Sequence, residues 1–253
     1  MAQLNIRLLG SFQVSLGTVP VTKFESNKVL ALLAYLAVES DQVHNREKLA
    51  ELLWPEMPAK RANANLSRTL YNLRRLVHNH QAEPPYLIRS LKAVQFNQES
   101  DYQLDVKSFR ERLSKTNIIE LPHRIKNQAQ LENIQTAVDL YRGDFMEGIG
   151  FDSSPVFDKW VWITQQRLQR KVLNGLHLLS DYYAEQGDLP KALSCAWRQV
   201  EFDPIDERAC RQLMWFLAAN NQRSQALTQF DRQHVMPAFF IKDMGLRLGI
   251  KLL

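Results

Sequence analysis

The sequence predicts a mainly α-helical protein with a small β part, and three observations support this prediction. Short runs of alternating or apolar residues, the pattern of β-strands, are confined to the first hundred residues. Leucine- and alanine-rich segments with a 3.6-residue period account for most of the remaining chain. Within these helical segments a similar pattern returns after 34 residues. We therefore expect a mixed first domain over residues 1–100 and an all-α domain over residues 101–253.

Composition narrows the class of protein. With 253 residues, 45% of them hydrophobic and 23% charged, the chain is an ordinary globular protein long enough for two domains. The longest apolar run, Val29 to Val38, is too short to span a bilayer and lies too far from the start for a signal peptide. We therefore expect a cytoplasmic protein that does not contact a membrane.

Reactive side chains are not arranged for catalysis. The sequence contains no nucleophile–base pair, no paired carboxylates in a plausible cleft and no phosphate-binding glycine loop, so we expect no enzyme activity. Cys195 and Cys210 form no CxxC pair, and the histidines are scattered, which predicts neither a metal site nor a cofactor. His177, on a leucine-rich helix face, is expected to be a hydrogen-bonded core residue.

The first hundred residues begin with strands and continue with helices. Apolar runs at residues 4–9, 11–16 and 19–21 are separated by glycine turns and predict a small antiparallel sheet. A helix capped by Ser26 or Asn27 should follow, because the next residues are rich in leucine and alanine.

After a polar break, a second helix is predicted over residues 46–53, where prolines at 55 and 58 end it.

The third predicted helix, residues 61–77, has two contrasting faces. At 100° per residue, one narrow stripe is apolar and contains Leu66, Leu70, Leu73 and Val77. The opposite side carries polar and basic residues, namely Arg61, Arg68, Tyr71, Asn72 and Arg75. No acid occurs between Glu56 and Glu83, so we expect a positive field without a local counter-charge. Such a helix suits a nucleic-acid groove, and a solvated surface helix is the alternative.

Two short strands, residues 85–89 and 93–97, should form a hairpin after this helix. Strands, three helices and a hairpin are the element order of a winged helix-turn-helix domain with an additional N-terminal sheet. In that fold the third helix enters the major groove of double-stranded DNA and the hairpin, or wing, contacts the backbone. The first hundred residues also hold twelve basic and eight acidic side chains, most of the chain's net charge of +5.

We assign DNA contacts by side-chain chemistry. Arg68 and Arg75 lie two turns apart on one face and can each pair with guanine O6 and N7. Asn65 and Asn72 have the amide chemistry that pairs with adenine. Phosphate contacts are assigned to Arg61, Tyr71, Lys28, Arg46, Arg89 and Lys92. For each residue the alternative is a solvated surface side chain.

Everything after the junction at residues 101–105 has helical periodicity. The predicted helices cover residues 106–113, 128–140, 157–186, 189–201, 206–220 and 224–236. Ala192 and Ala226, each in a similar position after a turn, lie 34 residues apart, which is the tetratricopeptide period. A tetratricopeptide-like helical-repeat domain is therefore predicted. Its tryptophans are expected in the core, with a hydrophobic ligand pocket as the alternative; they are Trp160, Trp162, Trp197 and Trp215.

Several motifs occur along the chain in a definite order. They are LNIRLLGSFQV, SNKVLALLAYL, REKLAELLWP, RANANLSRTLYNLRRLV, DYQLDVKSF, LYRGDFMEG, WVWITQQRLQRKV, EQGDLPKALSCAWRQVEFDPIDERACRQLM and KDMGLRLGI. In order and spacing they resemble the SARP-type regulators, which join an OmpR-like winged helix, the kind of effector domain found in phosphorelays, to a bacterial transcriptional activator domain. The resemblance covers nearly the whole chain. It implies a transcriptional activator at tandem direct repeats, with RNA polymerase as a partner. We expect the helical domain either to form a homodimer or to recruit the polymerase.

The chain departs from this family in two places. Ala93 to Phe96 stand where members have a Gly-Tyr pair in the wing, and the chain stops at Leu253, where members continue with a proline-rich segment. A fragment of a larger signalling regulator is therefore one interpretation. A protein-interaction scaffold or sensor that uses the helical repeats is the alternative function. The sequence leaves open the operator, the regulated genes, the sign of regulation, the activating signal and the oligomeric state.

Overall fold

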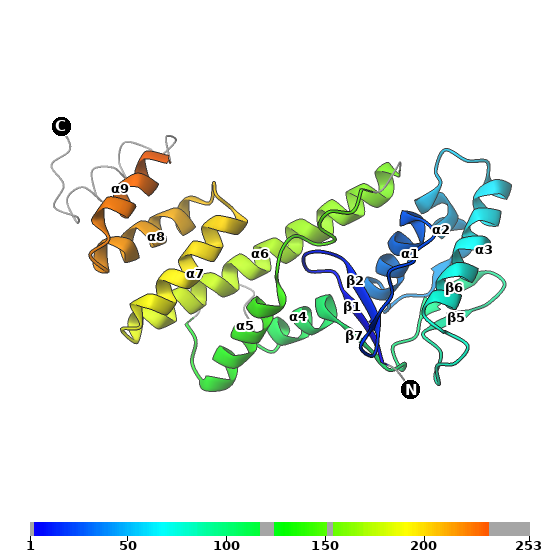
Figure 1. Cartoon of the computed structure of the whole chain (residues 1–253), viewed down its shortest axis with the longest axis horizontal. Coiled ribbons are helices and arrows are strands. Elements are labelled where there is room, and N and C mark those ends of the chain that lie inside the picture. Colours follow the sequence, from blue (N-terminus) through cyan, green and yellow to red (C-terminus); the bar gives the residue numbers. More distant parts are fainter. Residues whose placement is uncertain (1–2, 117–123, 151–153, 233–253) are drawn as a thin grey trace. The chain divides into compact units, whose positions relative to one another are not determined.

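The computed structural model describes residues 3–116, 124–150 and 154–232. The chain forms two compact units, of which the first comprises Met1–Ser114 and Asp139–Gln169 and the second Lys115–Val138 and Arg170–Leu253. The first unit contains every strand of the described residues, and the second is helical (Figure 1). The predicted fold class, mainly α with a small β part, is confirmed.

A four-stranded sheet opens the first unit. It has the order β3-β2-β1-β7, formed by β1 (Leu4–Arg7), β2 (Gln13–Leu16), β3 (Val19–Pro20) and β7 (Tyr102–Leu104). The first three strands are antiparallel, as expected, with Leu4 opposite Leu16 and Ile6 opposite Val14. Strand β7 was not predicted, and it runs parallel to β1. The sheet therefore joins the start of the chain to the segment that follows the wing.

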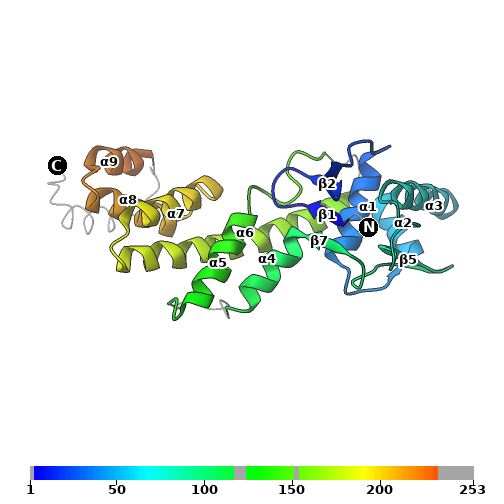
Figure 2. The ribbon, with the colours of Figure 1, turned by 60° about the horizontal axis from the view of Figure 1, so that its bottom comes forward.

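Three helices follow in the first unit, and in Figure 2 the first of them lies between this sheet and the other two: α1 (Asn27–Val38), α2 (Arg46–Leu53) and α3 (Ala59–Leu76). Helix α1 is the hydrophobic centre, because Leu32, Leu33 and Leu36 are fully buried. Ser26 occupies its N-cap position but makes no side-chain capping bond. Both α1 and α2 contact α3, so the recognition element of the predicted winged helix is held from two sides.

The wing completes a second, three-stranded sheet of order β4-β6-β5. Strands β5 (Leu87–Arg89) and β6 (Ala93–Phe96) form the expected hairpin, with Leu87 opposite Phe96. The two-residue strand β4 (His44–Asn45) was not predicted, and it pairs with β6 just before α2 begins. This strand ties the base of the wing to the start of α2.

Residues well beyond position 100 belong to the first unit. Helix α4 (Asp105–Ser114) begins with Asp105, whose carboxylate accepts hydrogen bonds from the Leu8 and Leu9 amides at 2.9–3.0 Å and pairs with Arg142 at 2.9 Å. Burial raises the pKa of this carboxyl, and the amide bonds act in the opposite direction. Asp105 thus links the first strand, α4 and the LYRGDFMEG segment.

Gly10 allows that segment to approach closely. Its φ of +101° favours glycine, and a Cβ there would lie 3.3 Å from the Gly143 nitrogen. The Gly10 amide donates to the Asp144 carbonyl at 2.9 Å. The LYRGDFMEG segment therefore packs against the residues that directly follow β1.

In the second unit, helices follow one another across short turns. The helices of this part of the chain are α5 (Gln128–Leu140), α6 (Pro155–Glu185), α7 (Leu189–Phe202), α8 (Glu207–Ala219) and α9 (Arg223–Arg232), with the first residues of α6 and the last of α5 belonging to the first unit. Helices α7 and α9 begin 34 residues apart, and Ala192 and Ala226 are both buried in one core cluster. These positions confirm the repeat. The end of the helix predicted to reach Met236 lies outside the described residues.

A ring of polar side chains joins α6, α7 and α8. The His177 Nδ1 lies 3.0 Å from Gln199 Oε1, Gln199 Nε2 donates to Gln212 Oε1 at 3.0 Å, and Gln212 Nε2 donates to Asp181 Oδ1 at 2.6 Å. Because Gln199 uses its amide nitrogen for Gln212, its oxygen accepts the proton of His177 Nδ1. His177 is buried, and burial lowers its pKa. The expectation of a hydrogen-bonded core histidine is confirmed.

Candidate nucleic-acid interface

Helix α3 is amphipathic in the structure as in the sequence. Leu66, Leu70 and Leu73 are buried, which confirms the predicted apolar stripe. The helix begins after Pro58, whose carbonyl accepts from the Arg61 and Ala62 amides, two residues earlier than predicted. Its last turn carries Arg74 and Arg75, a favourable placement near the negative end of the helix dipole.

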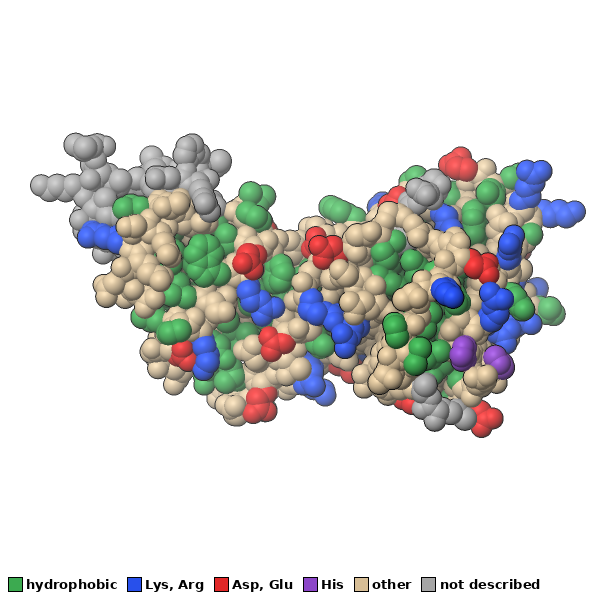
Figure 3. Space-filling model, viewed as in Figure 1, with side chains coloured by type: hydrophobic (Ala, Val, Ile, Leu, Met, Phe, Trp, Pro, Cys, Tyr) green, Lys and Arg blue, Asp and Glu red, His purple; other side chains and the backbone are tan. Residues whose placement is uncertain are grey.

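The outer face of α3 is open to solvent. Arg61 and Arg68 are exposed, and the Tyr71 side chain retains 64% of its accessible surface. Ala64 and Ser67, both small, are also exposed between them, so no bulky side chain blocks a close approach to this face. Figure 3 shows basic side chains projecting from the surface around α3. This face offers guanidinium and phenol donors over about three helical turns.

Two predicted base contacts are placed differently. Asn72 is 7% exposed, so its expected position on the outer face is wrong. Its amide Nδ2 donates to Glu25 Oε2, and Arg75 Nη2 donates to Glu25 Oε1 at 3.1 Å. Glu25, which directly precedes the N-cap of α1, therefore supplies the counter-charge that the sequence around the helix does not contain. The expectation that the positive field of this helix has no local counter-charge is therefore wrong at Arg75.

Two other predicted residues contact neighbouring side chains at the edge of α3. Asn65 is half-buried, and its amide donates to Met57 Sδ at 3.1 Å. Arg46, in the first turn of α2, donates from Nη2 to Ser67 Oγ at 2.8 Å, which brings a second helix's guanidinium to the exposed side of α3. The sequence could not indicate this approach, because the two residues are 21 positions apart.

Lys28 and the wing supply the remaining predicted positions. Lys28 is half-buried in the first turn of α1, whereas Arg89 and Lys92 are exposed in the wing. The Lys92 carbonyl accepts from the Arg46 amide at 3.0 Å, so the wing and the start of α2 are directly linked. Leu91, at the tip of the wing, is 97% exposed. We did not predict a role for Leu91, although an apolar residue in a polar turn could have drawn attention to it.

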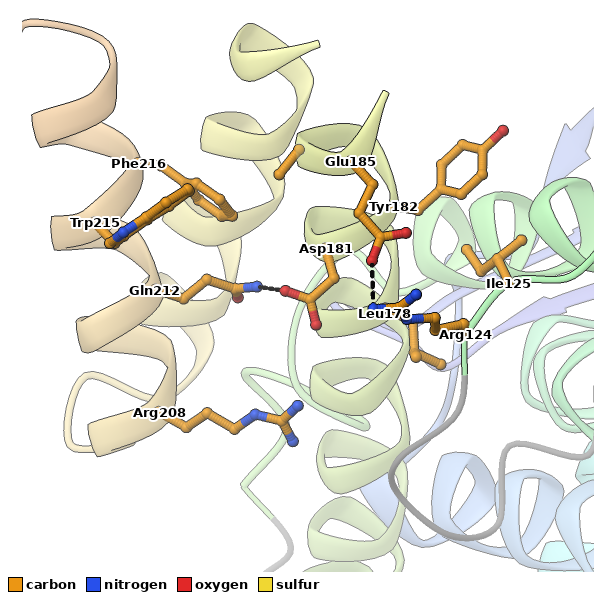
Figure 4. Close-up of a pocket in the computed structure, with 11 residues that line it drawn as sticks. Arg124, Ile125, Leu178, Asp181, Tyr182, Glu185, Arg208, Gln212, Trp215 and Phe216 are labelled. Carbon is orange, nitrogen blue, oxygen red and sulfur yellow. Dashed lines mark hydrogen bonds and ion pairs between the residues drawn. The ribbon is translucent and has the colours of Figure 1, made fainter. Parts of the chain in front are cut away.

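The second unit contains a separate pocket of about 570 Å³, drawn in Figure 4. It is lined by residues of α6 and α8 and by the segment before α5. Trp215 stands at one side with 49% exposure, and Asp181 and Arg208 point between the helices. Glu185 pairs with Arg124 at 3.3 Å, and Asp181 accepts from Gln212, so three of the four charged side chains that line the pocket already have polar partners.

Trp162 is exposed too, so the expectation that the tryptophans are core residues is wrong for Trp162 and Trp215.

Neither a metal-ligand cluster nor a membrane-spanning helix occurs in the described residues. Within residues 3–116, 124–150 and 154–232, no histidine, cysteine and carboxylate side chains cluster as metal ligands would. Over the same ranges no helix combines the length and apolarity needed to cross a membrane.

Comparison with known proteins gives two findings. Residues 104–237 match the family model described as the bacterial transcriptional activator domain. The whole structure is similar to that of Mycobacterium tuberculosis EmbR in complex with a low-affinity phosphopeptide, with a TM-score of 0.65 at 18% sequence identity. That similarity covers 92% of this chain and 59% of the EmbR chain, so the chain spans about three fifths of the EmbR chain. A search of curated protein sequences found no match.

Proposed function

Because the chain belongs to the family of proteins that contain a bacterial transcriptional activator domain, we propose that it binds DNA in a sequence-specific manner and activates transcription. This family is one of transcriptional regulators and not a class of enzymes. The proposed reader is α3, inserted in the major groove, with the wing on the adjacent backbone. Residues 1–100 form the DNA-binding domain in this proposal and residues 101–253 the activator domain.

One observation carries the proposal. Helix α3 buries its leucine stripe against α1 and α2 while it leaves Arg61, Arg68 and Tyr71 exposed. An exposed guanidinium in the middle of such a helix can reach the O6 and N7 atoms of guanine, and exposed basic groups at the helix edge can reach phosphates. Arg46 adds a cation from α2, the helix before α3. In helix-turn-helix proteins the helix before the recognition helix crosses the DNA backbone.

The residues then divide by role. We assign base contacts to Arg68 and Arg75, and to Asn65 if its bond to Met57 opens on binding. Asn72 is buried and bonded to Glu25, so no base contact is assigned to it. Phosphate contacts are assigned to Arg61, Tyr71, Lys28, Arg46, Arg89 and Lys92, of which Arg89 and Lys92 lie in the wing.

The transcriptional activator family suggests DNA and RNA polymerase as partners. We propose that the activator domain contacts RNA polymerase and supports formation of a homodimer on tandem direct repeats. The pocket between α6 and α8 favours an interaction role for the second unit, since Trp215 offers an exposed aromatic surface there. A scaffold or sensor without DNA binding is the rival function.

The decisive experiment measures binding of the full chain to upstream DNA from its own locus at several salt concentrations. We expect affinity to fall steeply as salt rises, because each phosphate contact releases a bound counterion. Selection of bound sequences from a random DNA pool would then give the operator and the spacing of its half-sites. Undetectable or salt-independent binding would reject the proposal, and stable capture of a protein partner without DNA retention would favour the scaffold.

A further inference from the structure

Glu25 bridges two residues of the proposed reading helix. Its carboxylate Oε2 accepts from Asn72 Nδ2, and its Oε1 accepts from Arg75 Nη2 at 3.1 Å. Asn72 and Arg75 are three residues apart on α3 and therefore neighbours on its surface. One carboxylate, 47 and 50 positions away in sequence, thus engages both of them.

The Glu25 bridge leaves donors of the Arg75 guanidinium available for DNA. A guanidinium has five N–H donors, and Glu25 uses one nitrogen of Arg75. The Arg75 side chain remains 61% exposed, so most of its surface is still accessible to a ligand. Asn72, in contrast, is almost completely buried, which suits it to hold the carboxylate and not to read a base.

We propose that Glu25 is a specificity-determining positioning residue, which fixes the direction of the Arg75 guanidinium for base contact while Asn72 fixes Glu25. The inference rests on the proposed DNA-binding function. An arginine that is already ordered loses less conformational entropy when it binds, so its contact with the correct base is strengthened. A free arginine would instead be drawn to any nearby phosphate, which carries no sequence information.

Plain charge repulsion between Glu25 and DNA would predict a different result for removal of the carboxylate. If the carboxylate only opposed the negative charge of DNA, its removal would raise affinity for all sequences alike and leave base preference unchanged. Under the positioning role, removal raises nonspecific affinity and lowers base preference at the same time. The two effects can therefore be separated in one measurement.

The experiment selects DNA from one random pool with the full-length wild type and four variants. Arg75→Ala defines the base positions that Arg75 reads. Glu25→Gln is nearly isosteric and removes the charge and one acceptor, and Asn72→Ala removes the support of Glu25. Glu56→Gln is the matched control, because Glu56 is an exposed acid just before α3 with no ion pair among the described residues. Thermal unfolding of each variant checks that it is folded.

We expect Glu25→Gln and Asn72→Ala to lose preference at the positions that Arg75→Ala loses. The loss should be about 2- to 10-fold, the effect of leaving one flexible side chain unordered before binding. Glu56→Gln should keep the wild-type preference. If Glu25→Gln behaves like Glu56→Gln while the wild type selects a clear motif, the positioning role is wrong and DNA binding stands. If the wild type selects no motif, the proposed function fails first and the positioning role fails with it.

Discussion

On α3, neighbouring polar residues differ in exposure because the surrounding chain differs. Arg68 and Tyr71 face solvent, whereas Asn72, one position further, is covered and bonded to Glu25. Helical periodicity predicted the buried leucines correctly because they form one continuous stripe along the helix. It misplaced Asn72, which it put with the polar residues on the opposite side of the helix. Asn72 is covered by the segment around Glu25, 47 positions earlier in the chain. Helical periodicity carries no information on where that segment lies.

Substitution of two exposed cations should separate base reading from phosphate binding. Arg68→Ala should cost about 1–3 kcal/mol of binding free energy and relax preference at one position of the operator. Lys92→Ala, in the wing, should weaken binding to all sequences alike and reduce the salt dependence. Competition titrations with operator and scrambled DNA at two salt concentrations provide the measurement. Equal, sequence-independent losses for both variants would show that the assignment of Arg68 to base contact is wrong.

Among the elements, the helices and five of the seven strands of the described residues were predicted, and two strands were missed. Helix α2 and helix α5 have the predicted bounds, because their apolar period is repeated over two or more turns. Strands β4 and β7 were missed, because β4 consists of two polar residues and β7 lies in the segment interpreted as the junction between the domains. Their existence depends on pairing with β6 and β1, which are far away in sequence.

The polar ring between α6, α7 and α8 should make the second unit sensitive to acid. Burial lowers the pKa of His177, so the folded protein holds this imidazole neutral at a pH where the unfolded chain already binds a proton. Stability should therefore fall as the pH decreases through the ordinary histidine pKa of about 6.5. Thermal unfolding of the full chain at pH 7.5 and 5.5 measures the effect.

The matched variant for this effect is His177→Gln, which keeps a side-chain donor toward Gln199 and removes the titrating group. Its unfolding temperature should decrease less between the two pH values than that of the wild type. Titrating groups away from His177 contribute equally to both proteins, so the difference reports on His177 together with Asp181, whose Oδ2 lies 3.9 Å from His177 Nε2. An equal decrease in both would mean that another group causes the acid sensitivity.

For the whole molecule, the two compact units of the structure differ from the two consecutive domains predicted from the sequence. The predicted functional domain ends at residue 100, and that boundary stays a prediction. The compact unit that contains α3 also includes β7, Asp105 and residues 139–169. Sequence order alone cannot show this return of the chain, because the residues that meet are more than 90 positions apart, as Leu8 and Asp105 are.

A fragment of residues 1–100 should consequently be less stable than a fragment of residues 1–169. The shorter fragment lacks the carboxylate of Asp105 that accepts the Leu8 and Leu9 amides, and it lacks the parallel partner of β1. Loss of hydrogen bonds to a buried charged group alone costs about 1.5–3 kcal/mol. Urea unfolding followed by circular dichroism should give a lower midpoint for the shorter fragment. Equal midpoints would show that the later residues add no stability.

The sequence by itself determined the secondary structure classes, the amphipathic third helix, the wing and the 34-residue helical repeat. Each of these depends on local propensity or on periodic burial, which are properties of residues close together in the chain. Only the tertiary structure decided that Glu25 holds Asn72 and Arg75, that Arg46 reaches Ser67 and that Asp105 ties the first strand to Arg142. These contacts join residues 21 to 97 positions apart. The exposed basic face was therefore predictable, and which of the polar side chains on α3 remain exposed was not.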